Sequence, residues 1–130
     1  MGYFVDSQRQ TLLTIEPHPV HNSQTVPLVV LIGEDTVSYG EIFSGVLQDV
    51  GRATLIGQAT KGNVEQLHAF DFSDGSRAWL AAASFTPLIS GADWETAGIQ
   101  PDVVVEGAWE DFTSENDPGV AAAIQLLRGD

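Results

Sequence analysis

Hydrophobic and polar positions form their most regular pattern between residues 26 and 50. The apolar run 28–32, bounded by a proline and a glycine, is typical of a strand that is buried on both faces. From Ser38 onward the apolar residues recur at helical spacing, and Gly51 is placed to end the predicted helix. The predicted apolar face consists of Ile42, Phe43, Val46, Leu47 and Val50, with Ser44, Gln48 and Asp49 on the opposite side.

The rest of the chain adds strands, a hairpin and a second helix. Two alternating runs, 64–72 and 77–85, flank the turn sequence Ser-Asp-Gly-Ser, which is a strong hairpin signal. Asp117 followed by Pro118 predicts the start of a last helix that ends near Gly129. Its predicted apolar stripe is Val120, Ile124 and Leu127. Short strands are expected at 3–5, 12–15, 53–56 and 103–105. The pattern predicts an α/β fold with a strand-helix-strand core, a β-hairpin and a C-terminal helix.

Composition narrows the class of partner. The chain has 130 residues, enough for one compact domain, and a hydrophobic fraction of 43% can supply a core. Acidic residues outnumber basic ones 18 to 5, a net charge of −13, which disfavours nucleic acid and anionic membrane surfaces as partners. No apolar stretch is long enough for membrane insertion, and cysteine is absent. Prolines beside His18 and His21 disfavour a metal site there, and no cofactor is expected.

Ser38 lies where the buried strand turns into the helix, and two interpretations fit that position. In the first, Ser38 caps the helix and Glu41, three residues on, completes a capping box. In the second, Ser38 is a nucleophile, and the backbone N–H of Tyr39 stabilises an oxyanion beside the positive end of the helix dipole. The Gly-x-Ser-x-Gly elbow is incomplete, because Thr36 replaces its first glycine. The local pattern alone favours the cap.

Three blocks of sequence carry a resemblance to a known family: PLVVLIGEDTVSYGEIFSGVLQDVGRATLIGQATKGN, FSDGSRAWLAAASFTP and GIQPDVVV. In this order they are similar to the tail-specific (C-terminal processing) serine protease family over residues 26–107. The resemblance implies a ClpP/crotonase-like fold and makes Ser38 the catalytic nucleophile. It also divides the chain into an N-terminal extended segment, 1–25, and the C-terminal part of a catalytic domain, 26–130.

The sequence departs from this family at the position of the general base. Well-known members carry a lysine where this chain has Asn63, and an asparagine cannot accept a proton from serine at neutral pH. Lys61, two residues earlier, is the alternative base. A lysine must be desolvated to act in that way, so an exposed turn lysine is the competing interpretation.

The segment WETAGIQPD, residues 94–102, is similar to part of the tricorn core protease and of the retinoid-binding protein repeats of photoreceptors, which lack the lysine. This similarity places the chain closer to that lysine-less branch. It implies that Glu95 belongs to the catalytic set and that the base is a histidine, which would precede residue 1. The sequence positions of His18, His21 and His68 do not match that histidine. The competing interpretation of Glu95 is a solvated loop carboxylate.

These resemblances together predict a serine-type peptidase, either an endopeptidase or a carboxyl-terminal processing enzyme, that acts on peptide or protein substrates. The location they imply is the cell envelope or another extracytoplasmic site. Because the base and half of the oxyanion hole would precede residue 1, this chain is expected to be a fragment that is inactive alone. Two alternatives stay open. One is a non-catalytic module that binds peptides or apolar ligands on the same fold, and the other is a homo-oligomer formed through surface that the missing half would cover.

Overall fold

The computed structural model describes residues 1–14, 16, 18–107, 111–113 and 115–129. Its strands are β1 (Gly2–Val5), β2 (Gln10–Leu13), β3 (Val29–Ile32), β4 (Thr54–Gly57), β5 (Glu65–Asp71), β6 (Arg77–Pro87) and β7 (Val103–Val104). Its helices are α1 (Tyr39–Asp49), α2 (Trp94–Ala97) and α3 (Pro118–Arg128). The predicted α/β class, hairpin and two long helices are confirmed, whereas α2 is absent from the prediction. Ile15, at the end of the second predicted strand, lies outside the described residues.

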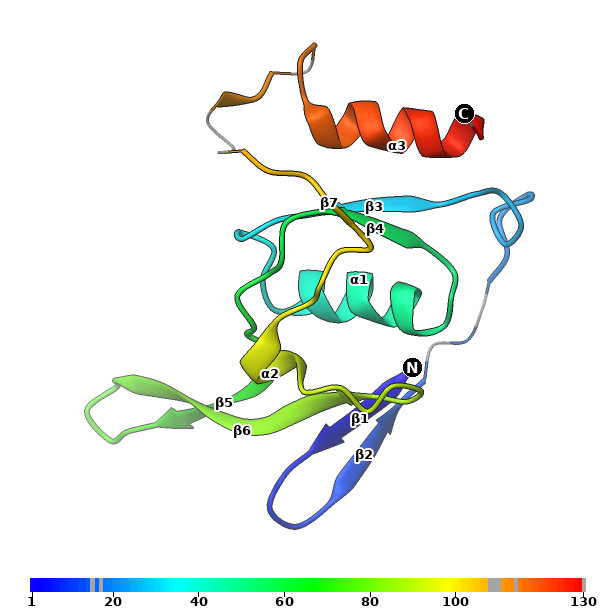
Figure 1. Cartoon of the computed structure of the whole chain (residues 1–130). Helices are drawn as coiled ribbons and strands as arrows, with labels where there is room; N and C mark the ends of the chain where they lie inside the picture. Colours follow the sequence, from blue (N-terminus) through cyan, green and yellow to red (C-terminus); the bar gives the residue numbers. More distant parts are fainter. Residues whose placement is uncertain (15, 17, 108–110, 114, 130) are drawn as a thin grey trace.

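The strands form two sheets that enclose α1 (Figure 1). Strands β3, β4 and β7 are parallel and lie in that order, while the antiparallel sheet has the order β2-β1-β6-β5. Helix α1 lies between the two sheets, and α3 covers the other face of the parallel sheet. Because β3, α1 and β4 form one strand-helix-strand unit, the carboxyl end of β3 leads directly to the first turn of α1.

The N-terminal residues are part of the antiparallel sheet. Strand β1 pairs with β6, so that Phe4 lies opposite Phe85, and β2 forms the edge of the sheet beside β1. The ring of Phe85 contacts Phe4 edge-on at 5.3 Å between centroids and stacks on Trp94 at 5.8 Å. These rings belong to a buried cluster between α1 and the two sheets, together with Ile32, Ile42, Leu55, Val64 and Ile99. The cluster also anchors α2, because Trp94 is part of it.

The predicted apolar face of α1 is wrong in part. Phe43 is 62% exposed and Val50 is also exposed, whereas Ser44 and Gly45 are buried. A helix between two sheets buries more than one stripe, so small residues are needed where a neighbour comes close. A Cβ atom at Gly45 would lie 2.8 Å from the ring of Trp94. The buried Ser44 hydroxyl is hydrogen-bonded, because its proton is shared between two carbonyl oxygens of the preceding turn, at 2.8 and 3.1 Å.

The predicted apolar stripe of α3 is also wrong. Val120, Ile124 and Leu127 are all exposed, while Gly119 is buried and Ala122 is half-buried. Small side chains at the contact let the helix approach the parallel sheet closely, and this turns the larger side chains outward. The predicted ends of α3 are confirmed, since the Asp117 side chain accepts hydrogen bonds from the first turn and Gly129 is left-handed at the other end.

Strands β5 and β6 continue beyond α1 as a projecting hairpin (Figure 1). The cross-strand register puts Leu67 and Trp79 on one face and Phe70 and Leu80 on the other. All four side chains are exposed, Trp79 by 58%. The hairpin therefore presents large apolar side chains on both faces.

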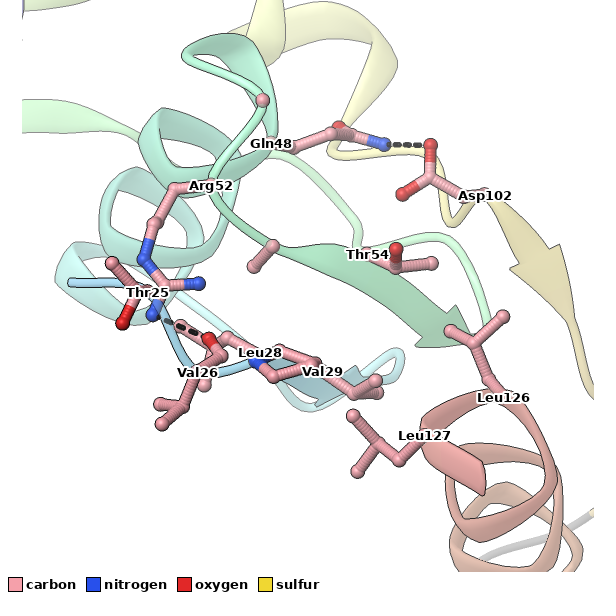
Figure 2. Close-up of a pocket in the computed structure, with 13 residues that line it drawn as sticks. Thr25, Val26, Leu28, Val29, Gln48, Arg52, Thr54, Asp102, Leu126 and Leu127 are labelled. Carbon is pink, nitrogen blue, oxygen red and sulfur yellow. Dashed lines mark hydrogen bonds between the residues drawn. The ribbon is translucent and has the colours of Figure 1, made fainter. Parts of the chain in front are cut away.

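Asp102 connects the segment after α2 to both β4 and α1. Its Oδ2 accepts a hydrogen bond from the Leu55 N–H at 2.7 Å, and its Oδ1 accepts one from the Gln48 side chain at 2.9 Å. Nearby, the Arg52 guanidinium donates to the carbonyl oxygen of Val26 at 2.9 Å. Figure 2 shows the Gln48–Asp102 and Arg52–Val26 hydrogen bonds beside a hollow that is also lined by Leu126 and Leu127 at the C-terminal end of α3. The volume of this hollow is about 650 Å³. The hollow lies at the amino-terminal ends of β3 and β4.

Candidate active site

Ser38 stands at the N-cap of α1, in a strained backbone conformation with φ 58° and ψ −126°. Among the described residues, His21 is the only other non-glycine residue with a positive φ. Such a conformation costs about 1–3 kcal/mol and persists only where the surrounding structure enforces it. Sharp strand-to-helix turns of this kind expose nucleophilic serines in other hydrolases. Ser38 is half-buried, so its side chain is not sealed inside the core.

Ser38 and Glu41 stand in the capping-box positions that the sequence suggests. The Glu41 side chain accepts a hydrogen bond from the Ser38 N–H at 2.9 Å. The N–H of Tyr39, at the first position of α1, has no intrahelical acceptor and lies at the positive end of the helix dipole. Hydroxyl and N–H together can act as a nucleophile and an oxyanion donor.

The Glu41 side chain is fully buried, with an exposed fraction of 0%. Burying a carboxyl group is costly unless hydrogen bonds replace its hydration. Glu41 receives three: Oε2 accepts from the Ser38 N–H, and Oε1 accepts from the Thr60 hydroxyl at 2.5 Å and from the Gly62 N–H at 2.9 Å. One side chain thus joins the Ser38 turn to the turn that follows β4.

The turn at 60–62 packs directly on α2. The Thr60 hydroxyl, which donates to Glu41, also accepts from the Ile99 N–H at 2.8 Å. Gly62 has a φ of 85°, and a Cβ there would lie 2.3 Å from the Glu95 carbonyl oxygen. Gly98 has a φ of 66°, and its Cβ would lie 2.0 Å from the Thr60 carbonyl oxygen. Both positions require glycine, because any side chain would separate the turn from α2.

Glu95 lies in α2 and is half-buried. Its Oε2 accepts a hydrogen bond from the Val64 N–H at 2.7 Å. Burial raises the pKa of the Glu95 carboxyl above its ordinary value, and the negative charges of Glu65 and Glu41 raise it further, against the opposing effect of the Val64 hydrogen bond. Ser38, Glu41 and Glu95 are thereby connected through the backbone of residues 60–64.

Lys61 and Asn63 point to other partners. The Lys61 ammonium lies 3.7 Å from the Glu34 carboxyl, and both side chains are 64% exposed. A lysine with this much access to water lacks the desolvation that a basic lysine needs. The Asn63 amide, with its nitrogen turned toward Glu65, donates to that carboxyl at 3.0 and 2.6 Å. Among the described residues, neither side chain is hydrogen-bonded to Ser38.

A cleft of about 960 Å³ lies at the carboxyl ends of β3 and β4 and beside the start of α3, and Ser38 is not among the residues that line it. Its walls include the turn 33–36, the strand end 56–58 and the segment 105–107. In open α/β sheets ligands bind at the carboxyl ends of the strands, which favours this cleft over the hollow of Figure 2 at the opposite ends. Thr36, two residues before Ser38, is part of its wall.

The three histidines lie apart from this arrangement. His18 and His21 are exposed in the connection between β2 and β3, and His68 is exposed on β5. Within the described ranges, no group of three or more His, Asp or Glu side chains is placed to hold a metal ion. The described helices are all too short or too polar to cross a membrane.

Sequence reasoning missed the extent of the Glu41 contacts. The pattern Ser-x-x-Glu indicated only a local cap, whereas the carboxyl group also bonds to residues 19 and 21 positions further along the chain. A signal was present, because Glu41 precedes Ile42 at the start of the apolar face of a helix that follows a buried strand. A carboxyl group at that point has to find donors inside the protein.

Comparison with known proteins agrees with this geometry. The family described as peptidase family S41 matches residues 3–105. The chain is 41% identical over 109 residues to a carboxyl-terminal-processing protease of Synechocystis sp., covering 79% of this chain and 25% of that protein. It is 32% identical over 118 residues to the tricorn protease of Thermoplasma volcanium, covering 90% of this chain and 11% of that protein. Among solved structures, the photosystem II D1 C-terminal processing protease superposes with a TM-score of 0.60 at 30% identity, covering 75% of this chain and 24% of that one.

The fold is the ClpP/crotonase-like α/β fold of these structural neighbours. The chain belongs to peptidase family S41. The match begins at residue 3, so it includes the β1–β2 hairpin. The chain spans about a quarter of the length of the carboxyl-terminal-processing proteases that it matches.

Proposed function

We propose that the protein is a serine-type peptidase in which Ser38 attacks the carbonyl carbon of a peptide bond. The backbone N–H of Tyr39 would hold the oxygen as it becomes negatively charged. The observation that carries this proposal is the strained N-cap conformation of Ser38 at the first turn of α1. Family membership supports the same reaction type.

The general base is proposed to be a histidine from residues outside this sequence, assisted by Glu95. No described lysine or histidine is hydrogen-bonded to Ser38, and the resemblance to the family implies that Asn63 stands where well-known members carry the lysine. An imidazole would accept the serine proton and return it to the leaving amine. The proposal thus places the chain in the lysine-less branch that resembles the tricorn core. On this proposal the chain alone has no turnover.

Peptide or protein segments are the proposed substrates, bound along the cleft whose wall includes Thr36, two residues before Ser38. The proposed location is extracytoplasmic. One relative, from Arabidopsis thaliana, is named as a chloroplastic carboxyl-terminal-processing peptidase and is 34% identical over 106 residues.

A fluorophosphonate probe on the full-length protein tests the nucleophile, because it reacts only with an activated serine. We expect covalent labelling that disappears in Ser38→Ala and persists in Ser44→Ala. Ser44 is a matched control on the same helix, since its hydroxyl is buried and bonded to the Gly40 carbonyl oxygen. Absence of labelling in the intact protein would refute the peptidase proposal.

A non-catalytic binding module is the second candidate, and Asn63 at the lysine position favours it. Such a module would bind a peptide in the cleft without cleaving it. It would also bind that peptide equally well after Ser38→Ala, and it would not react with the probe. The same labelling experiment, combined with a peptide-binding measurement, therefore separates the two functions.

A further inference from the structure

We propose that Glu41 is a positioning residue that holds the strained Ser38 turn in its reactive conformation and couples it to the 60–62 turn beneath Glu95. This inference rests on the proposed peptidase function and adds a role to a residue that would otherwise serve only as a helix cap. Its basis is a fully buried carboxyl group with three hydrogen-bond donors, one in the Ser38 turn and two in the 60–62 turn.

A helix cap alone does not explain these contacts. The glutamate of a capping box needs only the N–H of the N-cap residue, and it can do so at the protein surface. Glu41 instead directs Oε2 to the Ser38 N–H and Oε1 to Thr60 and Gly62, inside the protein. The second oxygen binds a turn that contributes nothing to the end of α1. The Glu41 side chain therefore also fixes the distance between the Ser38 turn and the 60–62 turn.

The hydrogen bond to Ser38 controls the groups that would react. The ψ angle of Ser38 sets the plane of the peptide group between Ser38 and Tyr39, and so the direction of the Tyr39 N–H. A turn that relaxed from φ 58° to the ordinary negative region would move both the hydroxyl and this N–H. Holding the Ser38 N–H in place resists that relaxation.

The other oxygen extends the same control toward Glu95. Thr60 is bonded to Glu41 on one side and to the Ile99 N–H on the other, at the end of α2. Gly62 is bonded to Glu41 and packs against the carbonyl oxygen of Glu95. The Ser38 turn and the 60–62 turn beside Glu95 are therefore both held by the carboxyl group of Glu41.

The substitution Glu41→Gln separates positioning from simple burial. A glutamine has one acceptor oxygen, so if that oxygen serves Thr60 and Gly62, its amide nitrogen faces the Ser38 N–H, donor against donor. The matched pair Thr60→Val and Thr60→Ser removes and restores the hydroxyl contact. Ile42→Val is the control, because this neighbour on α1 is equally part of the buried core but makes no side-chain hydrogen bond.

In the full-length protein we expect Glu41→Gln to lower the rate of fluorophosphonate labelling and the kcat for peptide cleavage roughly 10- to 100-fold, with KM little changed, because a displacement of about 1 Å has effects of this size. Thr60→Ser should restore what Thr60→Val loses. Ile42→Val should lower only thermal stability. A Glu41→Gln enzyme with kcat within about twofold of the wild type, or a Thr60→Ser no better than Thr60→Val, would overturn the proposal.

Amide hydrogen exchange at Ser38 distinguishes this failure from failure of the peptidase function. The Ser38 amide should be protected in the wild type and should exchange faster in Glu41→Gln, whether or not the protein is an enzyme. If the wild type is never labelled but this change in exchange occurs, the peptidase proposal is refuted. The inference that Glu41 holds the Ser38 N–H is then still supported. Unchanged protection in Glu41→Gln would overturn the positioning role even in an active enzyme.

Discussion

Replacing Asp102 tests how much its hydrogen bonds to β4 and α1 contribute to the stability of the chain. In Asp102→Ala two hydrogen bonds disappear, one from the Leu55 N–H at 2.7 Å and one from Gln48 at 2.9 Å. Leu55 has no exposed surface, so its N–H has little access to water as a replacement acceptor. A hydrogen bond to a carboxylate is worth about 1.5–3 kcal/mol, and the exposed contact with Gln48 about 0.5–1 kcal/mol.

The expected loss of unfolding free energy in Asp102→Ala is therefore about 2–4 kcal/mol. At this chain length each kcal/mol lowers Tm by roughly 4 °C, which gives a fall of roughly 8–16 °C. Chemical denaturation followed by circular dichroism measures the free energy directly. Gln48→Ala keeps the bond to Leu55 but removes two exposed hydrogen bonds, to Asp102 and to the Gln100 carbonyl oxygen, and should lose about 1–2 kcal/mol. Asp102→Asn should lie between, because its amide oxygen can still accept from one of the two donors.

Two results would refute this reasoning. A loss below about 0.5 kcal/mol in Asp102→Ala would mean that water replaces the carboxylate at the Leu55 N–H. An equal loss in Gln48→Ala and Asp102→Ala would mean that the hydrogen bonds of the Gln48 side chain, and not the bond from the strand to Asp102, carry the stability. The double variant then measures their coupling energy.

Two further predictions concern α1 and α2. Gly45→Ala should destabilise the chain by about 0.5–2 kcal/mol in denaturation, because its Cβ would lie 2.8 Å from Trp94, and this overpacking exceeds the gain in helix propensity. Gly40→Ala, whose Cβ meets its nearest atom at 3.4 Å, should be neutral or stabilising, and an equal loss in both variants would contradict the packing argument. For Glu95 the folded pKa is raised, so its contribution to stability is complete below the ordinary value of 4.5 and is lost as pH rises through the folded pKa. Glu95→Gln should therefore gain stability relative to the wild type in urea unfolding as the pH rises from below 4.5 through the folded pKa of Glu95, and a difference that does not depend on pH would argue against the raised pKa.

The elements that the sequence pattern predicted well have strong local causes. The β5–β6 hairpin follows from alternating residues around a turn with Gly75 at φ 86°, and α3 follows from an aspartate cap with proline behind it. Both signals act over a few residues, so no distant contact is needed to detect them. The apolar run between Pro27 and Gly33 likewise predicts the strand β3 before Ser38.

The features that could not be predicted depend on what packs against each element. Phe43 satisfies the helical period yet faces solvent, and Gly45 is buried because the Trp94 ring occupies the space beside it. Helix α2 has only four residues, which is too short for any periodicity. For the candidate site, the pattern located Ser38 and Glu41 as a pair, but the contacts of Glu41 with Thr60 and Gly62 form only when the chain has folded.

The projecting β5–β6 hairpin makes the behaviour of the chain in solution sensitive to acidity and salt. Its apolar faces would attract one another between molecules, and a net charge of −13 keeps the molecules apart at neutral pH. Near the isoelectric point of about 4.2 this repulsion vanishes, and added salt weakens it at any pH. Mild acid or high ionic strength should therefore bring the hairpins into contact, and dilute neutral buffer should keep them dispersed.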